Sequence, residues 1–346
     1  MQKKPSVLLR AIKRVQDHPV LYSGKKIHIV YFGIFSALNA MSILTAFYYY
    51  LFIHGYAVPE STYYMLPVGG WMVWAGARLM HLMALGKKFY RNPRKYLFET
   101  GFYFQGGIVG AVLWSILYAS VANIPLSFVW DGLCFGTLLG QFFGRIGCFN
   151  YGCCYGKTTT SRWGVAYTNL KSKILRLHPE LQGVRVHPVQ LYKAGLNLAA
   201  FTTLMCLIPL HLPNGLITIG FLIYHGATRI MMEWFRADIY FHQKRNRITY
   251  YFSVMAILSP IPLLLFGKAA DPLFGQRSPL SEPHSLKSVN QLLFHTPYLI
   301  EIILLIGAIM FVGYGIHGKT LGRFPIPERG THEHHRDDRR GRSLRH

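Results

Sequence analysis

The stretch of the chain best suited to chemistry is Gly144–Gly156, which combines one arginine, four glycines and three cysteines. A guanidinium group is always charged and binds phosphate oxygens through paired hydrogen bonds. The glycines beside Arg145, at positions 144 and 147, let a backbone segment or a ligand approach it closely. Because the stretch follows a long apolar segment, we predict that it forms the floor of an active site at one face of a membrane.

A second candidate anion site is the run Arg229-Ile-Met-Met-Glu233-Trp-Phe-Arg236. Positions i, i+4 and i+7 share one face of a helix, so Arg229 and Glu233 are predicted to pair, with Arg236 near the interface. A structural ion pair beside an interfacial arginine is the alternative. Two arginines that meet at one interface suit a phospholipid headgroup, which favours Arg145 and Arg229 as ligands of a phosphate.

A candidate proton-transfer residue, His187, opens the run His187-Pro188-Val189-Gln190-Leu191-Tyr192, where a later apolar segment begins. The intrinsic pKa of a histidine such as His187 suits a general base near neutral pH. A histidine bonded to the backbone at the start of a helix explains the run equally well.

Charged side chains also lie inside earlier apolar runs, where a charge is costly and usually paired or functional. Asp131 lies fourteen residues before Arg145, about four helical turns away. We predict that Asp131 is the buried partner of Arg78 in preference to a catalytic acid. His81, three residues after Arg78, is predicted to be a core or interfacial histidine.

The three clustered cysteines have the spacing Cys148-x4-Cys153-Cys154. Structural zinc sites normally have paired Cys-x2–4-Cys blocks, so the spacing is a weak zinc signal. A disulfide in an oxidising compartment and a cysteine nucleophile with a nearby base are further alternatives. Small buried side chains are the default prediction, and we expect neither a metal ion nor a cofactor.

The composition is that of a polytopic membrane protein. Of the 346 residues, 51% are hydrophobic and 15% are charged, compared with about 25% charged residues in soluble domains. The formal net charge is +23, from 37 lysines and arginines against 14 acidic residues. The basic residues flank apolar runs, which indicates contact with anionic lipid headgroups and not with nucleic acid. The sequence shows no cleavable signal peptide.

Eight apolar runs approach the roughly 20 residues that a helix needs to cross a bilayer, where only helices satisfy their own backbone. We predict an all-α membrane protein with seven transmembrane helices, an eighth added after them, and a small extramembrane head between the fourth and the fifth. The predicted spans are about 28–53, 62–86, 104–122, 126–146, 189–211, 215–235, 249–266 and 298–315, and the head covers 148–188.

The predicted domain organisation places a main transmembrane domain at 28–266 and the eighth helix at 297–316. Residues 1–27 form a basic interfacial segment, and residues 267–296 form a polar loop. The basic tail, residues 317–346, is predicted to be disordered.

Five motifs in order resemble the prolipoprotein diacylglyceryl transferase family. The family signature Gly-Arg-x-Gly-Asn-Phe-x-Asn-Gly-Glu-x-x-Gly aligns without gaps with Gly144–Gly156. The other motifs, which follow the family's order, are Gly76-Ala77-Arg78, Gln105-Gly106-Gly107-Ile108-Val109-Gly110, His187-Pro188-x-Gln190-Leu191-Tyr192 and Arg229-x3-Glu233-x2-Arg236. Asp131 also stands at the family's distance before the arginine. The resemblance covers about residues 28–266.

Several polar residues of the family pattern are replaced. Cys148 and Cys153 stand where the signature has Asn and Glu, Gln105 replaces a histidine, and Lys193 replaces a glutamate. Phe32 replaces a tyrosine in the first span. The arginines are retained, so the resemblance supports the fold and phosphate binding better than it supports activity on the usual substrates.

The resemblance implies transfer of a diacylglyceryl group from phosphatidylglycerol to the lipobox cysteine of a preprolipoprotein signal peptide, with membrane lipids as the surroundings. We assign catalytic roles to Arg145, Arg229, His187 and Glu233. Substrate binding is assigned to Arg145, Arg229, Arg236, Gln105, Gly106, Gly107, Gly156, Gln190, Tyr192, Asp131 and Arg78. With the family histidine absent at Gln105, His187 or Tyr192 is the candidate base.

The sequence leaves two orientations in the membrane and more than one function open. The family implies the bacterial inner membrane, with the active site near the outer leaflet, whereas the distribution of basic loops places both termini and the head in the cytoplasm. Competing functions are a phospholipid-dependent transferase with another acceptor and a non-catalytic lipid-binding membrane protein. A transporter is a weaker alternative, because inverted repeats are not evident.

Overall fold

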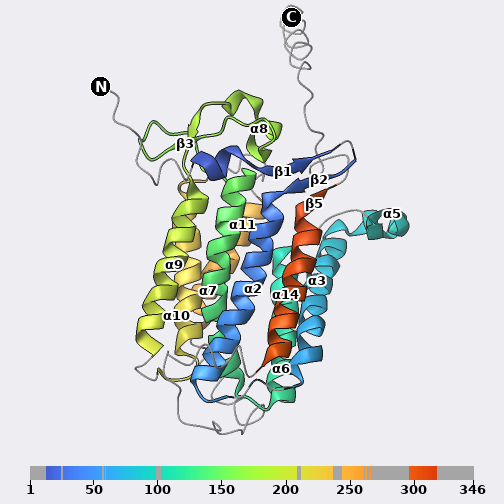
Figure 1. Ribbon diagram of the computed structural model, residues 1–346, viewed down its shortest axis with the longest axis vertical. Coiled ribbons are helices and arrows are strands. Elements are labelled where there is room, and N and C mark those ends of the chain that lie inside the picture. The colour runs from blue at the N-terminus through green and yellow to red at the C-terminus, as the bar shows by residue number, and fades with distance from the viewer. Residues whose placement is uncertain are drawn as a thin grey trace, which may run out of the picture.

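The computed structural model describes residues 13–317 except for 25, 57, 59, 99–102, 209–211, 237–243, 261, 263–264 and 266–295. Long helices run up and down in a bundle, with a small head at one end (Figure 1). They are α2 (Tyr31–Ile53), α3 (Thr62–Leu85), α6 (Phe104–Ala122), α7 (Leu126–Tyr151), α9 (Val189–Leu207), α10 (Leu216–Glu233), α11 (Lys244–Leu258) and α14 (Pro297–Gly315).

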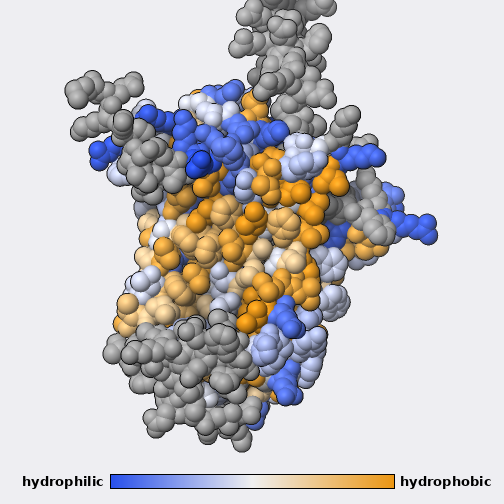
Figure 2. All heavy atoms as spheres, viewed as in Figure 1, coloured by the Kyte–Doolittle hydropathy of each residue, from blue (hydrophilic) through white to orange (hydrophobic). Residues whose placement is uncertain are grey.

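Four of these helices are long and apolar enough to cross a membrane: Tyr31–Ile53, Gln105–Ala122, Leu126–Tyr151 and Pro297–Gly315. Hydrophobic side chains gather around the middle of the bundle, and hydrophilic ones gather on the head (Figure 2). The chain is therefore a helical membrane protein. That all eight long helices cross the bilayer stays a prediction.

Short strands at the head end modify the all-α prediction. Strand β1 (Val20–Ser23) pairs with β2 (His28–Val30), which pairs with β5 (Ile316–His317). The first predicted span therefore begins as a strand at residue 28 and becomes helical at Tyr31. Of the predicted interfacial segment, residues 1–12 lie outside the described residues, as do most of the 267–296 loop and nearly all of the tail.

A row of glycines on α7 brings this helix close to α2. The row is Gly132, Gly136, Gly140 and Gly144, with a period of four residues, so it follows one helical face. A Cβ at Gly136 would lie 2.4 Å from the carbonyl oxygen of Ile43, and one at Gly144 would lie 2.3 Å from the Asn39 amide nitrogen. Small residues of this kind let membrane helices pack backbone to backbone.

The eighth long helix, α14, is part of the bundle and packs against α2. A Cβ at Gly33 would lie 2.4 Å from the Cα of Gly315, and one at Gly307 would lie 2.6 Å from the Met41 sulfur. Strand β5 follows α14 directly and extends the sheet that precedes α2. Helix α14 is thus held in the bundle by its contacts with α2 and by the pairing of β5 with β2.

Helices α3 and α6 meet through a second pair of glycines. A Cβ at Gly76 would lie 2.3 Å from the Gly106 carbonyl oxygen, and one at Gly106 would lie 2.2 Å from the Gly76 carbonyl oxygen. A Cβ at Gly107 would also face α3, 3.6 Å from Val73. The space that Gly106 leaves is therefore taken by α3 and not, as predicted, by a substrate chain.

Gly76→Ala is expected to lower the free energy of unfolding by about 1–3 kcal/mol, because the new methyl group overlaps a backbone oxygen. Gly70→Ala, in the same helix, is the matched control, since nothing lies within 4 Å of its Cβ. The control is expected to be neutral or slightly stabilising. Thermal unfolding of both variants in detergent compares them, and equal midpoints would refute the close packing of α3 and α6.

The head, residues 152–188, has a small core of its own. Tyr167, Ile174, Leu175 and Val186 of the head are buried together with Phe149 from the end of α7. The head contains β3 (Val165–Ala166), β4 (Arg185–Val186), α8 (Lys173–Leu177) and the 3-10 helix η1 (Pro179–Leu181). This core fixes the head onto the end of α7.

Candidate active site

Three separate segments of the chain meet where the head joins the bundle. The backbone N–H of Gly156 donates to the His187 carbonyl at 2.9 Å, and that of Lys157 donates to the Phe235 carbonyl at 2.7 Å. Gly156 and Arg236 form an isolated β-bridge. A Cβ at Gly156 would lie 2.6 Å from both carbonyl oxygens, so only glycine fits. Gly156 therefore joins the signature, the His187 segment and the end of α10.

The first part of the signature stretch is helical, because α7 continues past the predicted end of the fourth span. The predicted fourth span ended at residue 146, whereas α7 ends at Tyr151. Gly152, with φ 75°, adopts the left-handed conformation that ends the helix. Arg145 thus projects from a helix two turns before its end. Gly144 and Gly147 face Asn39 and Phe35 of α2, so they serve helix packing and not ligand approach.

The turn after α7 brings the three cysteines together. The Cys153 N–H donates to the Cys148 carbonyl at 3.0 Å, which folds the chain back over the last helical turn. Cys154 follows with φ 59°, a backbone conformation that costs a non-glycine residue about 1–3 kcal/mol. The three Sγ atoms lie within 4.8 Å of one another. All three thiols are free and partly buried.

The arginines stand beside this thiol cluster. Hydrogen bonds from the thiols of Cys148 and Cys153 hold the pKa of Cys154 well below its usual range. The guanidinium groups of Arg145 and Arg236 lower the pKa of Cys154 further. Both arginines therefore lie close to the thiols. In the part of the chain that the structure describes, Arg145 makes no hydrogen bond or ion pair, so its guanidinium is available to an anion.

The predicted pair on α10 is confirmed. Arg229 Nη2 lies 2.5 Å from Glu233 Oε1 at the spacing i, i+4, and both side chains are partly exposed. Arg145 and Arg229 each interact electrostatically with the Lys193 amine and the His225 ring. The two arginines, from α7 and α10, therefore face a common region beside α9.

Lys193 is a component of the site that the sequence marked only as a departure from the family pattern. It is 5% exposed, and its ammonium group donates to Thr228 Oγ1 and lies 4.3 Å from the centre of the Tyr224 ring. Two more hydrogen bonds extend this network. The Tyr224 hydroxyl donates to Asn197 Oδ1 at 2.8 Å, and Asn197 Nδ2 donates to Gln141 Oε1 at 3.2 Å. Polar side chains of α7, α9 and α10 thus line the region between the arginines.

The residues of the His187 run have local partners in this structure. The ring nitrogen Nδ1 of His187 lies 3.2 Å from the Tyr192 hydroxyl, so the two candidate bases bond to each other. Gln190 Nε2 donates to the Cys153 carbonyl at 2.7 Å. Gln190 therefore fixes the cysteine turn, a role that its predicted assignment to substrate binding did not include.

Asp131 has a different partner from the one predicted. Its carboxylate accepts hydrogen bonds from the Gly215 N–H at 2.7 Å, the Thr218 N–H at 2.7 Å and the Thr218 hydroxyl at 2.6 Å. Asp131 thereby caps the start of α10, where a carboxylate is favoured by the helix dipole. Arg78 instead donates to the carbonyls of Tyr96 and Leu97 in α5 (Pro93–Phe98), at the other end of the bundle. The Asp131–Arg78 pairing is therefore wrong.

Asp131→Asn is expected to lower the free energy of unfolding by about 1–3 kcal/mol, because one amide hydrogen-bond acceptor replaces two carboxylate oxygens at a buried site. Phospholipid affinity is expected to stay within twofold of the wild type. Denaturant unfolding and a lipid-binding assay on one preparation separate the two effects. Normal stability with lost lipid binding would return Asp131 to the substrate-binding set.

Gln105 and His81 both lie at the head end of their helices. Gln105 is the second residue of α6 and follows Tyr103, whose N–H donates to the Ala77 carbonyl at 3.0 Å. The His81 ring lies 5.9 Å from the Tyr103 ring, which agrees with a structural histidine. The binding role of Gln105 stays a prediction.

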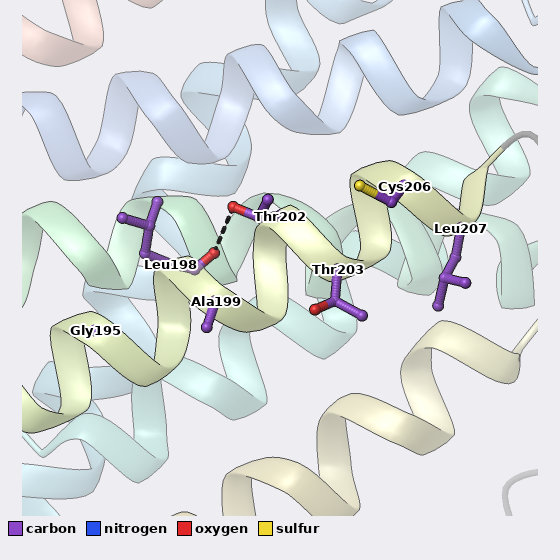
Figure 3. A pocket seen from close by; sticks show the side chains of 7 residues that line it. All are labelled: Gly195, Leu198, Ala199, Thr202, Thr203, Cys206 and Leu207. Atoms are coloured by element: carbon purple, nitrogen blue, oxygen red, sulfur yellow. Dashed lines mark hydrogen bonds between the residues drawn. The ribbon is translucent and has the colours of Figure 1, made fainter.

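A shallow hollow on the outer surface of α9 is a separate feature (Figure 3). Its lining comes from this one helix and contains no charged side chain: Gly195, Leu198, Ala199, Thr202, Thr203, Cys206 and Leu207. The Thr202 hydroxyl donates to the Leu198 carbonyl at 2.9 Å. The hollow offers no group for phosphate binding, so the arginine region is the better candidate for the active site.

The chain is similar to known proteins over most of its length. The sequence model of a family described as prolipoprotein diacylglyceryl transferase matches residues 19–266. A phosphatidylglycerol–prolipoprotein diacylglyceryl transferase from Wolbachia sp. subsp. Drosophila simulans is 31% identical over 201 residues, covering 56% of this chain and 70% of the relative. A protein of the same description from Dehalococcoides mccartyi is 25% identical over 223 residues, covering 64% of this chain and 82% of the relative.

Proposed function

Because this chain belongs to the prolipoprotein diacylglyceryl transferase family, we propose that it transfers the diacylglyceryl group of phosphatidylglycerol to a prolipoprotein. The convergence of Arg145 and Arg229 on one polar region between α7, α9 and α10 carries this proposal. The acceptor atom is the lipobox cysteine sulfur of the signal peptide, and the product is a thioether.

The arginines supply the main catalytic effect. As the carbon–oxygen bond of the lipid breaks, negative charge grows on the departing glycerol phosphate. Preorganised cations in a water-poor site stabilise that charge more strongly than they stabilise the starting lipid. Arg145 binds phosphate oxygens, Glu233 holds Arg229 in position, and Arg236 adds positive charge from the head side.

The acceptor thiol must lose its proton before or during attack. With the Nδ1–H of His187 donating to the Tyr192 oxygen, Nε2 of His187 is the candidate acceptor of that proton. The reaction takes place at the end of the bundle that carries the head. We place this end at the outer leaflet of the bacterial inner membrane, where a preprolipoprotein signal peptide enters from the side.

Complementation tests the proposed function in cells. The chain is expected to restore lipoprotein maturation and growth in a bacterium depleted of its own diacylglyceryl transferase. An Arg145→Gln variant, expressed and inserted at the same level, serves as the control and is expected to fail. A wild-type chain that inserts correctly and yet supports no maturation would favour another acceptor or a lipid-binding role.

A further inference from the structure

The thiol cluster of Cys148, Cys153 and Cys154 has the properties of a metal site. Its three Sγ atoms lie within 4.8 Å of one another. Three thiolates around one zinc ion, each about 2.3 Å from the metal, lie about 3.8 Å apart. A shift of about 1 Å or less per sulfur therefore closes the site.

Hydrogen bonds and a specific backbone conformation hold the three cysteines together. The Cys153 N–H binds the Cys148 carbonyl, and Gln190 holds the Cys153 carbonyl at 2.7 Å. Cys154 is held in the left-handed backbone region, with φ 59°. Among the described residues, Asn123 is the other non-glycine residue with positive φ, and asparagine tolerates that conformation far better.

The charges near the cluster also suit a metal thiolate. Binding of one Zn²⁺ by three thiols releases three protons and leaves a net charge of −1 on the metal and its ligands. Arg145 stands three residues before Cys148 on α7, and Arg236 forms a β-bridge with Gly156, two residues after Cys154, so both arginines bring positive charge to the cluster. Zinc with three protein ligands keeps a fourth position for water or substrate.

We infer that Cys148, Cys153 and Cys154 bind one zinc ion whose open fourth position takes the acceptor thiol. The zinc site itself stands on the geometry alone, whereas its role with the acceptor rests on the proposed function. A thiol bound to zinc loses its proton readily near neutral pH, and the proton passes to the candidate acceptor His187. Zinc would thereby take over the function of the family's polar residues, which are replaced in this chain by Gln105, Cys148 and Cys153.

The transfer step then balances. The zinc-bound thiolate sulfur attacks the glyceryl carbon, forming the carbon–sulfur bond as the carbon–oxygen bond to the phosphate breaks. The electron pair of that bond leaves with the glycerol phosphate, whose charge Arg145 and Arg229 stabilise. The thioether product is a neutral and weaker zinc ligand, so it leaves the metal.

Metal analysis of the full chain in detergent tests the site. Wild-type protein exposed to zinc and then desalted is expected to retain one zinc per chain, and cobalt is expected to give a thiolate charge-transfer band. Cys148→Ser is expected to lose both signals. Cys134→Ser and Cys206→Ser are matched controls that keep them, since these thiols lie outside the cluster. Equal zinc in Cys148→Ser and the wild type would overturn the site.

A titration of the cobalt-loaded protein with a lipobox peptide tests the role of the fourth position. The peptide is expected to change the charge-transfer band, and a serine analogue is expected to leave it unchanged. An unchanged band with both peptides would overturn the acceptor role. Thioether formation by a zinc-free chain would overturn the role of zinc in the transfer and leave the proposed function intact. A zinc-loaded chain that forms no thioether would instead contradict the proposed function.

Discussion

Arg145→Gln is expected to lower kcat/KM for diacylglyceryl transfer by about 100- to 1,000-fold, the usual loss when one preorganised donor to a developing charge is removed. Arg145 has no hydrogen-bond or ion-pair partner among the described residues, so its charge is free for the substrate. Glutamine keeps hydrogen-bonding capacity but removes the charge. The loss is therefore expected mainly in kcat and less in KM.

Two further variants make the Arg145 result specific. Arg145→Lys keeps the charge but loses the planar fork, so an intermediate loss is expected. Arg162→Gln is the control for basic residues of the head, because Arg162 is exposed. Its Cζ atom lies 5.1 Å from the centre of the Trp163 ring. Its activity is expected to stay within twofold of the wild type. Equal activity of the Arg145→Gln and Arg162→Gln variants would refute a phosphate-binding role for Arg145.

A double-mutant cycle on Arg229 and Glu233 is expected to show strong coupling. Arg229→Ala removes a phosphate ligand and is expected to lower kcat/KM by at least about 100-fold. Glu233→Ala is expected to cost less, because the guanidinium remains but loses the carboxylate 2.5 Å away that orients it. The double variant is expected to be no worse than Arg229→Ala alone, since Glu233 acts through Arg229.

The pair His178 and Glu180 provides the control cycle. Its atoms lie 2.9 Å apart in the head, and the Glu180 side chain is 67% exposed, so removal of either residue is expected to leave activity nearly unchanged. Additive losses for Arg229 and Glu233 would show that Glu233 acts independently. Circular dichroism of each variant separates loss of activity from loss of the fold.

The sequence predicts the long helices well because membrane spans need long apolar runs. It also predicts the Arg229–Glu233 pair, since helical spacing places the two side chains on one face. The Asp131–Arg78 pair failed because charge complementarity says nothing about which end of the bundle a residue occupies. Asp131 binds the start of α10 instead.

The roles of the α7 glycines, Lys193 and the three cysteines were not predicted from the sequence. The period of four from Gly132 to Gly144 was a readable sign of close helix packing, yet the glycines near Arg145 were interpreted as room for a ligand. Lys193 lies in the arginine region through tertiary contacts between α9 and α10, which no local pattern predicts. The convergence of three cysteines likewise depends on the turn at Gly152.

Mass spectrometry of a purified reaction tests the central claim most directly. The full chain in detergent is incubated with phosphatidylglycerol and a lipobox peptide, and the Arg145→Gln variant serves as the control. The expected result is a peptide that gains one diacylglyceryl group on its cysteine sulfur, with release of glycerol phosphate. A folded wild-type chain that binds the lipid but leaves the peptide mass unchanged would contradict the assignment of this site to diacylglyceryl transfer.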